Sequence, residues 1–95
     1  MKLLINVEAA KSIKAVMQFI ESQNTNGSGN RWFYKLQRYL LEIIEVSQSL
    51  PLCKYPPFRE KKLHCIIYKD WVVAFKNEKD KCVIMAFVYG TNLNY

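Results

Sequence analysis

The residues best suited to chemistry lie close together in one short stretch, KYPPFREKKLHC, at positions 54–65. The stretch holds the only histidine of the chain and four cations: His64, Lys54, Arg59, Lys61 and Lys62. Only one acid, Glu60, lies among them, and a proline pair stiffens the middle. Such a cluster fits either a site that grips and cuts a polyanion or a solvated loop, and the residue types leave both open.

RNA cleavage without a metal ion requires three kinds of group. A base takes the proton of the 2′-hydroxyl, an acid protonates the leaving oxygen, and fixed positive charge stabilises the transition state. His64 is the proton-transfer candidate because an imidazole titrates near neutral pH. Arg59 can hold two phosphate oxygens at once, and Tyr89 is a further candidate acid or stacking group. The candidates for RNA or phosphate binding are lysines: Lys54, Lys61 and Lys62.

Each of these candidates also has a structural interpretation. A single histidine on a strand more often supports the fold than performs catalysis. Lysines that flank a strand protect it against misfolded pairing, and a tyrosine such as Tyr89 can simply pack. No serine or cysteine has a base at a spacing typical of nucleophilic catalysis, so the sequence gives no support to acyl chemistry.

Length and charge set the broad class of the protein. The 95 residues carry a formal charge of +6 and have a pI of about 9.3. This length predicts a single domain over residues 1–95. A basic surface favours polyanions or an acidic protein as partners.

The cysteine and histidine counts bear on compartment and cofactors. The count of three cysteines is odd and no CxxC pair occurs; Cys65 and Cys82 lie in apolar runs and are predicted to be buried thiols. This usage indicates a reducing cytoplasm. With a single histidine a zinc site would also need carboxylates, so no metal and no cofactor are expected. No run approaches the roughly 20 apolar residues of a membrane helix, and the N-terminal run is too short for a signal peptide.

Hydrophobic periodicity predicts the elements that must position the cluster. Residues 2–8 alternate as a short strand, and from residue 9 the apolar positions follow helical spacing. The polar connector SQNTNGSGN leads into a second helix, capped by Ser28 or Asn30, whose apolar stripe runs to Leu50 before Pro51. Three strand-like runs follow, at residues 63–69, 71–77 and 81–89. The order strand–helix–helix–strand–strand–strand predicts an α+β fold, with a helical hairpin packed on one face of a mainly antiparallel sheet.

The short gap between the first two of these three runs fixes their pairing. If Lys69 and Asp70 form the turn, Tyr68 pairs with Trp71, Ile66 with Val73 and His64 with Phe75. Both faces of this pair are apolar, and two helices cover only one. We expect the helices on the face with the smaller side chains, which leaves three aromatic residues exposed for a partner protein: Tyr68, Trp71 and Phe75. The alternative is a register shifted by one residue, with the aromatic residues in the core.

The chain resembles the RelE/ParE toxin superfamily of type II toxin-antitoxin systems, some of which act in plasmid stabilization. The resemblance is carried by SLPLCKYPPFREKK followed by LHCIIYKDWVVAFKNEKDKCVIMAFVYGTNLNY. In that family a helical hairpin leads through a proline-containing basic loop into a three-strand meander. The likeness is one of layout and hydrophobicity over nearly the whole chain.

The resemblance implies a cytoplasmic toxin that a cognate antitoxin wraps and neutralises, and that could be a homodimer when free. RelE-like members are mRNA interferases that cut messages on the ribosome, whereas ParE-like members inhibit DNA gyrase without enzymatic activity. Here Arg59 occupies a basic-loop position, and His64 stands at a strand position that is often arginine. Asn92 stands where relatives often have a tail arginine, which favours the gyrase alternative. The histidine beside the basic loop favours the nuclease, and a degenerate toxin that only binds its antitoxin is the third reading.

Overall fold

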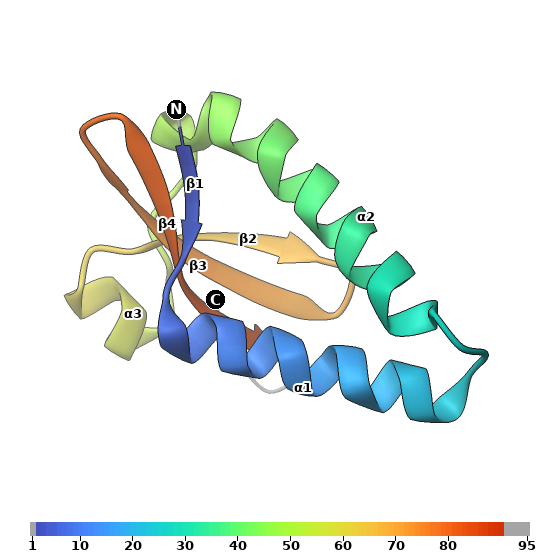
Figure 1. Cartoon of the computed structure of the whole chain (residues 1–95). Helices are drawn as coiled ribbons and strands as arrows, with labels where there is room; N and C mark the ends of the chain where they lie inside the picture. Colours follow the sequence, from blue (N-terminus) through green and yellow to red (C-terminus); the bar gives the residue numbers. More distant parts are fainter. Residues whose placement is uncertain (1, 91–95) are drawn as a thin grey trace.

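Among residues 2–90, one strand comes first in the chain, four helical segments follow it, and three strands come last. The computed structural model describes residues 2–90, and Figure 1 shows their arrangement. The elements are β1 (Lys2–Ile5), α1 (Val7–Gln23), α2 (Ser28–Ile43), the 3-10 helix η1 (Ile44–Ser49), α3 (Pro56–Glu60), β2 (His64–Tyr68), β3 (Trp71–Glu78) and β4 (Lys81–Tyr89). The α+β class is confirmed. The last turn of the predicted second helix is η1, and α3 lies inside the stretch that we expected to be a loop.

The four strands form one mixed sheet in the order β1-β4-β3-β2. β1 runs parallel to β4, and the other two pairs are antiparallel. The predicted register of the first hairpin is confirmed, because Tyr68 pairs with Trp71 and His64 pairs with Phe75. Lys69 and Asp70 form the turn, and the alternative register shifted by one residue does not occur.

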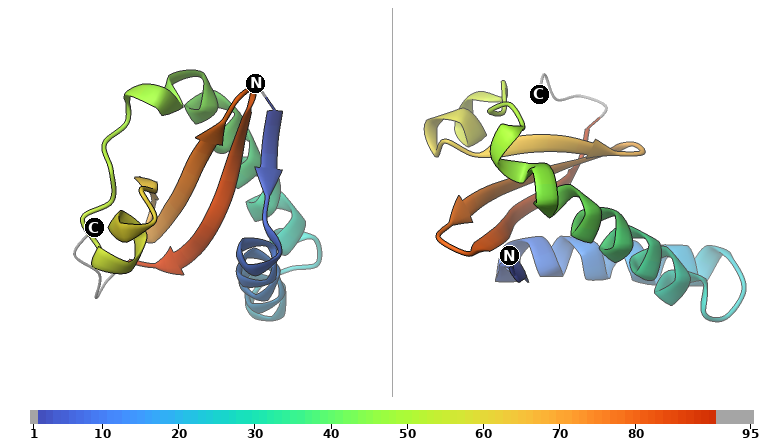
Figure 2. Two further views of the ribbon diagram at one scale, coloured as in Figure 1. Left: turned by 90° about the vertical axis from the view of Figure 1, so that its left-hand side faces the viewer. Right: turned by 90° about the horizontal axis from the view of Figure 1, so that it is seen from above.

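The prediction of which face the helices cover is wrong. α1 and α2 diverge across one face of the sheet, while α3 lies on the other side (Figures 1 and 2). The helix-covered face is the aromatic one: Phe75 is 1% exposed, Tyr68 is buried at 8%, and Trp71 packs against the same core. Tyr68, Trp71 and Phe75 therefore do not form an exposed partner-binding face.

The size of the side chains explains this arrangement. Two helices that diverge over a sheet leave a wide space, and large aromatic side chains fill it and bury the most apolar area. Trp71 stacks on Phe87 with 4.9 Å between ring centroids, and Trp32 of α2 meets Phe87 edge-on at 5.9 Å. The small side chains lie on the opposite face, where the chain segment before β2 packs closely over Ala74. Small side chains do let another part of the chain approach the sheet closely, as we expected. The part that approaches is this segment and not the helices.

The junction of α1 and α2 depends on Glu21. Gly27, with φ 87°, is the residue before α2, and no hydroxyl or amide side chain caps the helix, so the predicted caps Ser28 and Asn30 are wrong. The Glu21 carboxylate instead accepts hydrogen bonds from the N–H groups of Gly27 (2.7 Å) and Gly29 (2.9 Å). These bonds hold the pKa of the Glu21 carboxyl below its usual value. A Cβ at Gly29 would lie 2.5 Å from the carbonyl oxygen of Met17, so the two helices meet where only glycine fits.

A pair of substitutions tests which face of the hairpin is the core. Phe75→Ala should lower the free energy of unfolding by about 3–5 kcal/mol, because it empties a fully buried site. Ile67→Ala, on the opposite face and 45% exposed, should cost less than about 1 kcal/mol. Urea unfolding of the two variants measures both values. Equal costs, or the reverse order, would contradict the assignment of the faces.

Glu21→Gln should lower the melting temperature at neutral pH, because a neutral amide accepts the two N–H bonds more weakly than a carboxylate. The folded-state pKa of Glu21 lies below the unfolded value, so its stabilisation is complete above the unfolded pKa and disappears as the pH falls through the folded one. The difference in melting temperature between wild type and variant should therefore shrink on acidification. Glu42→Gln, at an exposed position on α2, is the control. A difference that persists at low pH would reject this role for Glu21.

Candidate phosphate-binding site

The basic stretch is closed at both ends by backbone pairing. The N–H of Cys53 donates to the carbonyl of Leu63 at 2.8 Å, and the N–H of Cys65 donates to the carbonyl of Pro51 at 3.4 Å. Between them Leu52 forms an antiparallel bridge with His64. Residues 51–53 thus run along the outer edge of β2 and protect the start of an otherwise open strand. Residues 54–62 between the two ends form a closed loop.

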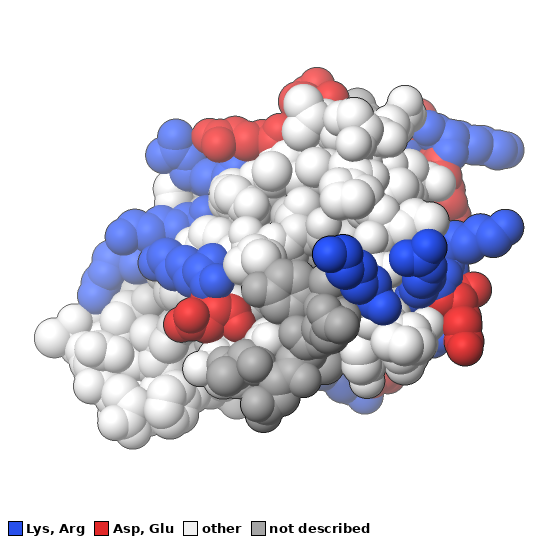
Figure 3. Space-filling view, turned by 180° about the vertical axis from the view of Figure 1, so that it is seen from behind, with Lys and Arg blue, Asp and Glu red and all other residues white. Residues whose placement is uncertain are grey.

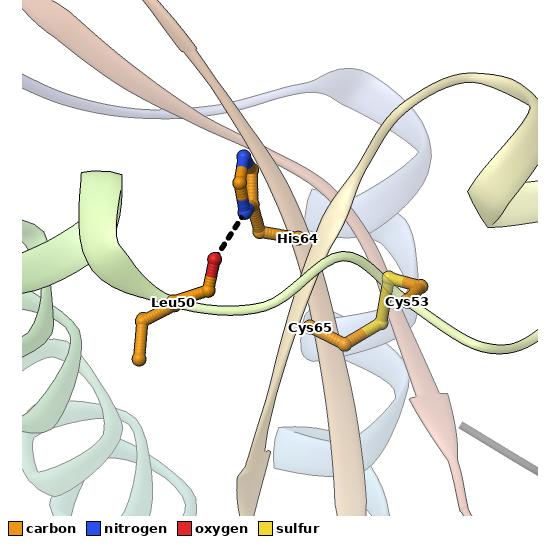
Figure 4. The surroundings of a disulfide bond; sticks show 4 residues. All are labelled: Leu50, Cys53, His64 and Cys65. Atoms are coloured by element: carbon orange, nitrogen blue, oxygen red, sulfur yellow. Dashed lines mark hydrogen bonds between the residues drawn. A yellow bond between two sulfur atoms is a disulfide. The ribbon is translucent and has the colours of Figure 1, made fainter.

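A disulfide bond between Cys53 and Cys65 reinforces this closure, with 4.9 Å between the Cα atoms (Figure 4). The expectation that Cys65 is a free thiol is wrong. Cys82 is free and buried as predicted, and desolvation raises the pKa of its thiol to about 11. Disulfides are rare in a reducing cytoplasm, so the cysteine usage no longer supports that compartment.

The loop contains α3, which presents the cations outward. Pro56 and Pro57 begin the helix, where the missing N–H of proline costs nothing. Phe58 packs on the cluster of Cys53, Leu63 and Ala74 and meets the Tyr55 ring edge-on at 4.9 Å. One side of α3 is thereby fixed to the sheet, and the other side faces solvent.

All the predicted phosphate ligands lie on this exposed side of the loop. The cations of the loop are exposed and, within residues 2–90, none has a carboxylate within 4 Å: Lys54, Arg59, Lys61 and Lys62. Figure 3 shows positive side chains on the side of α3, and others on the opposite side, over α2. Lys76 on β3 contrasts with them, because its ammonium lies 2.6 Å from the Glu78 carboxylate. The loop cations therefore keep their charge available for an external anion.

His64 lies at the start of β2 with its ring on the other side of the strand from the disulfide (Figure 4). Its Nδ1 lies 2.6 Å from the carbonyl oxygen of Leu50, and its ring stacks on Phe75 at 5.5 Å. A carbonyl only accepts, so Nδ1 must donate; in the neutral ring the proton acceptor is then Nε2. The same contacts also suit a purely structural histidine. No hydrogen bond joins its ring to the loop cations in the described part of the chain.

Tyr89 and His64 do not share one site. Tyr89 is 56% exposed and contacts Trp71 edge-on at 5.3 Å. It pairs with Trp71, and Trp71 pairs with Tyr68, so Tyr89 lies level with the far end of β2 from His64. Four residues of extended strand span about 13 Å, which is too far for both groups to act on one phosphodiester. Asn92, the other position singled out near the C-terminus, lies outside the described residues.

Comparison with known proteins does not assign a family: no protein-family model matches the chain, and no curated protein matches it. Among residues 2–90, no group of three or more histidine, cysteine, aspartate or glutamate side chains is arranged to hold a metal ion. No helix in the same part of the chain is long and apolar enough to cross a membrane. The candidate site is therefore the set of loop cations; His64 follows them in sequence, with its ring on the other side of β2 from the disulfide.

The disulfide was missed because Cys53 and Cys65 are twelve residues apart and lack a recognisable spacing. Their positions at the two ends of the basic stretch were the available signal. Two cysteines on neighbouring paired segments can come close enough to form a disulfide. The pairing of residues 51–53 with the start of β2 was not predicted. The backbone hydrogen bonds between residues 51–53 and the start of β2 bring the two sulfur atoms together.

Removal of the disulfide should destabilise the protein measurably. Cross-linking a loop of this length restricts the unfolded chain by about 3 kcal/mol, so Cys53→Ala with Cys65→Ala should lower the free energy of unfolding by about that amount. Cys82→Ala, at the free thiol, is the control for loss of a buried sulfur. Iodoacetamide added to the denatured, unreduced protein should modify one cysteine, and after reduction three. Modification of all three without reduction would show that the bond does not form.

Proposed function

We propose that the chain is a toxin of the RelE/ParE type that binds mRNA at the ribosome and cleaves it. The observation that supports this function best is the loop of residues 54–62. Its four cations are exposed, lack carboxylate partners within the described residues, and stand on a backbone closed at both ends. A cognate antitoxin remains the expected protein partner. The cytoplasm is expected from the resemblance to RelE/ParE toxins alone, since the disulfide removes the support of the cysteine usage.

The closed loop favours phosphate binding for two physical reasons. Four positive charges and a single acid, Glu60, on one short segment leave an excess of positive charge that attracts a polyanion and releases its counterions on binding. In addition, a loop held at both ends loses little conformational freedom when the ligand arrives, so more of the electrostatic energy appears as affinity. Arg59 stands at the end of α3 and can bind two phosphate oxygens, while the lysines supply point charge.

In the proposed reaction His64 acts as the base. Its Nε2 takes the proton of the 2′-hydroxyl, and the 2′-oxygen attacks the adjacent phosphorus. The bond from phosphorus to the 5′-oxygen breaks, which leaves a 2′,3′-cyclic phosphate, and solvent protonates the 5′-oxygen. The carbonyl of Leu50 orients the ring for this role, as an accepting oxygen does for many catalytic histidines. Because Tyr89 is too distant to serve as the acid, we expect slow cleavage.

One observation favours a second candidate function. The ring of His64 is held by a backbone carbonyl and by Phe75, and it faces away from the side of β2 that carries the disulfide. These contacts are what a structural histidine requires. The alternative is a toxin that binds its target without chemistry, as a ParE-like inhibitor of DNA gyrase, or a degenerate toxin that binds only its antitoxin. The loop cations would then form a binding surface.

Induced expression in a bacterial host, with the 5′ ends of transcripts mapped in the same cells, tests the function. Arg59→Gln with Lys61→Gln should relieve growth arrest and remove new 5′ ends within translated messages. Lys35→Gln with Arg38→Gln removes the same charge from exposed positions on α2 and should leave both unchanged. His64→Asn keeps a donor near the Leu50 carbonyl but removes the base, so it should abolish cleavage while the protein stays folded.

The outcomes separate the candidate functions. Arrest with intact messages, together with inhibition of gyrase supercoiling, would replace the nuclease by the inhibitor. Wild-type cleavage in His64→Asn would reject His64 as the base and leave the loop as the site. Absence of arrest would leave only antitoxin binding, which copurification with the product of an adjacent gene would reveal.

A further inference from the structure

Three turns of the chain place a lysine where glycine is the usual residue. In the described residues, the only non-glycine positions with positive φ are Lys62 (57°), Lys69 (56°) and Lys79 (50°). A side chain at such a position crowds the following backbone, so glycine or asparagine is normally found there. Three lysines at the three strained positions suggest that their side chains serve a purpose that glycine could not.

A contact within the protein accounts for the lysine at position 69, whereas no such contact accounts for Lys62 or Lys79 in the described residues. The Lys69 ammonium lies 5.6 Å from the centre of the Tyr68 ring, a cation–π contact that covers the core at the first hairpin turn. Lys62 and Lys79 are exposed, and neither has a carboxylate within 4 Å or an aromatic ring beneath it in residues 2–90. An external partner is therefore the simplest reason for their charge.

Lys62 and Lys79 lie at the same end of the sheet. Lys62 comes just before β2, and Lys79 is at the tip of the β3–β4 hairpin. Because β2 and β3 are antiparallel, the start of β2 faces the end of β3, and Lys69 lies at the opposite end. Figure 3 shows positive side chains both over α3 and over the tip of this hairpin, on the same side of the molecule.

The hairpin tip carries a small excess of positive charge over acid. Glu78 is engaged by Lys76 at 2.6 Å and by Lys81 at 4.0 Å, which leaves Asp80 as the acid beside Lys79. Lys2 pairs with Lys81 across the parallel strands and adds a further cation. A cleft of about 680 Å³ lies here, lined by Lys2, Leu4 and residues 78–81. The tip thus combines a lysine at positive φ with a recess lined by three lysines and two acids, Glu78 and Asp80.

We propose that Lys79 is a second phosphate contact, and that it extends the α3 site from Lys62 along the end of the sheet to the hairpin tip. The ligand that fits is a single RNA strand, whose successive phosphates can follow a line of separate point charges. Both lysines stand at turns, with φ 57° at Lys62 and 50° at Lys79. This inference rests on the proposed function, because it names the path of the same substrate.

Glycine substitution separates binding from folding. Lys62→Gly and Lys79→Gly each remove the charge and relieve the strained conformation, while glycine adds freedom to the unfolded chain. We therefore expect an unchanged or higher melting temperature together with weaker binding of RNA. Lys69→Gly removes the same charge from the same kind of turn at the other end of the sheet, and is the matched control. Lys79→Asn tolerates positive φ with less chain freedom than glycine, and Lys79→Arg keeps the charge.

Binding of a fluorescein-labelled oligouridylate, measured by anisotropy at several salt concentrations, gives the readout. Lys62→Gly and Lys79→Gly should each weaken affinity about two- to fivefold, the range of one exposed charge pair. Each should also reduce the slope of log K against log salt by about 0.7, the value for one lost contact to a single strand. Lys79→Asn should behave as Lys79→Gly does, and Lys79→Arg and Lys69→Gly should bind as wild type does.

Three results would overturn the proposal. Equal losses in Lys69→Gly and Lys79→Gly would show that only net charge matters. Unchanged binding in Lys79→Gly, with weaker binding in Arg59→Gln, would confine the site to α3 and leave the proposed function intact. Absence of RNA binding by the wild type, with salt-dependent binding of polyglutamate, would assign the surface to an acidic protein and reject both proposals.

Discussion

The structure depends on one short stretch of backbone pairing, in which residues 51–53 lie along the outer edge of β2. The paired residues lie between the helices α1, α2 and η1 and the strands β2, β3 and β4 in the sequence. It covers the open edge of the sheet, buries Cys53 and Leu63 against Ala74, and brings Cys53 to Cys65. Between the paired ends, Phe58 packs back on this cluster and the charged residues face solvent. The exposed cations are thus a consequence of how the edge of the sheet is covered.

Local patterns predicted those parts of the fold that local constraints decide. The register of β2 on β3 was predicted on the assumption that Lys69 and Asp70 form the turn, because a two-residue turn fixes which residues pair. The apolar stripe of α2 was recognised from its helical period, and Leu36 and Leu40 are buried as expected. The phosphate-binding candidates were found from residue type and spacing, and all four lie exposed on the predicted segment.

The features that the sequence did not predict depend on contacts between residues far apart in the chain. Which face of the sheet the helices cover depends on the space between them, so Phe75 was expected outside and lies in the core. The N-terminus of α2 is satisfied by Glu21 from the preceding helix, a contact that no capping pattern encodes. Tyr89 was grouped with His64 because both suit proton transfer, but pairing in the sheet places them at opposite ends of β2.

The disulfide turns residues 53–65 into a covalent ring that contains every cation of the candidate site. Proteases that cut after lysine or arginine would find their preferred bonds exposed on this ring. A single cut there opens the ring without releasing any fragment, since Cys53 and Cys65 still join the two pieces. The nicked protein would keep its helices and its sheet attached to one another. The segment that must be exposed and basic in order to bind is thus the segment in which a cut leaves the two parts of the protein joined.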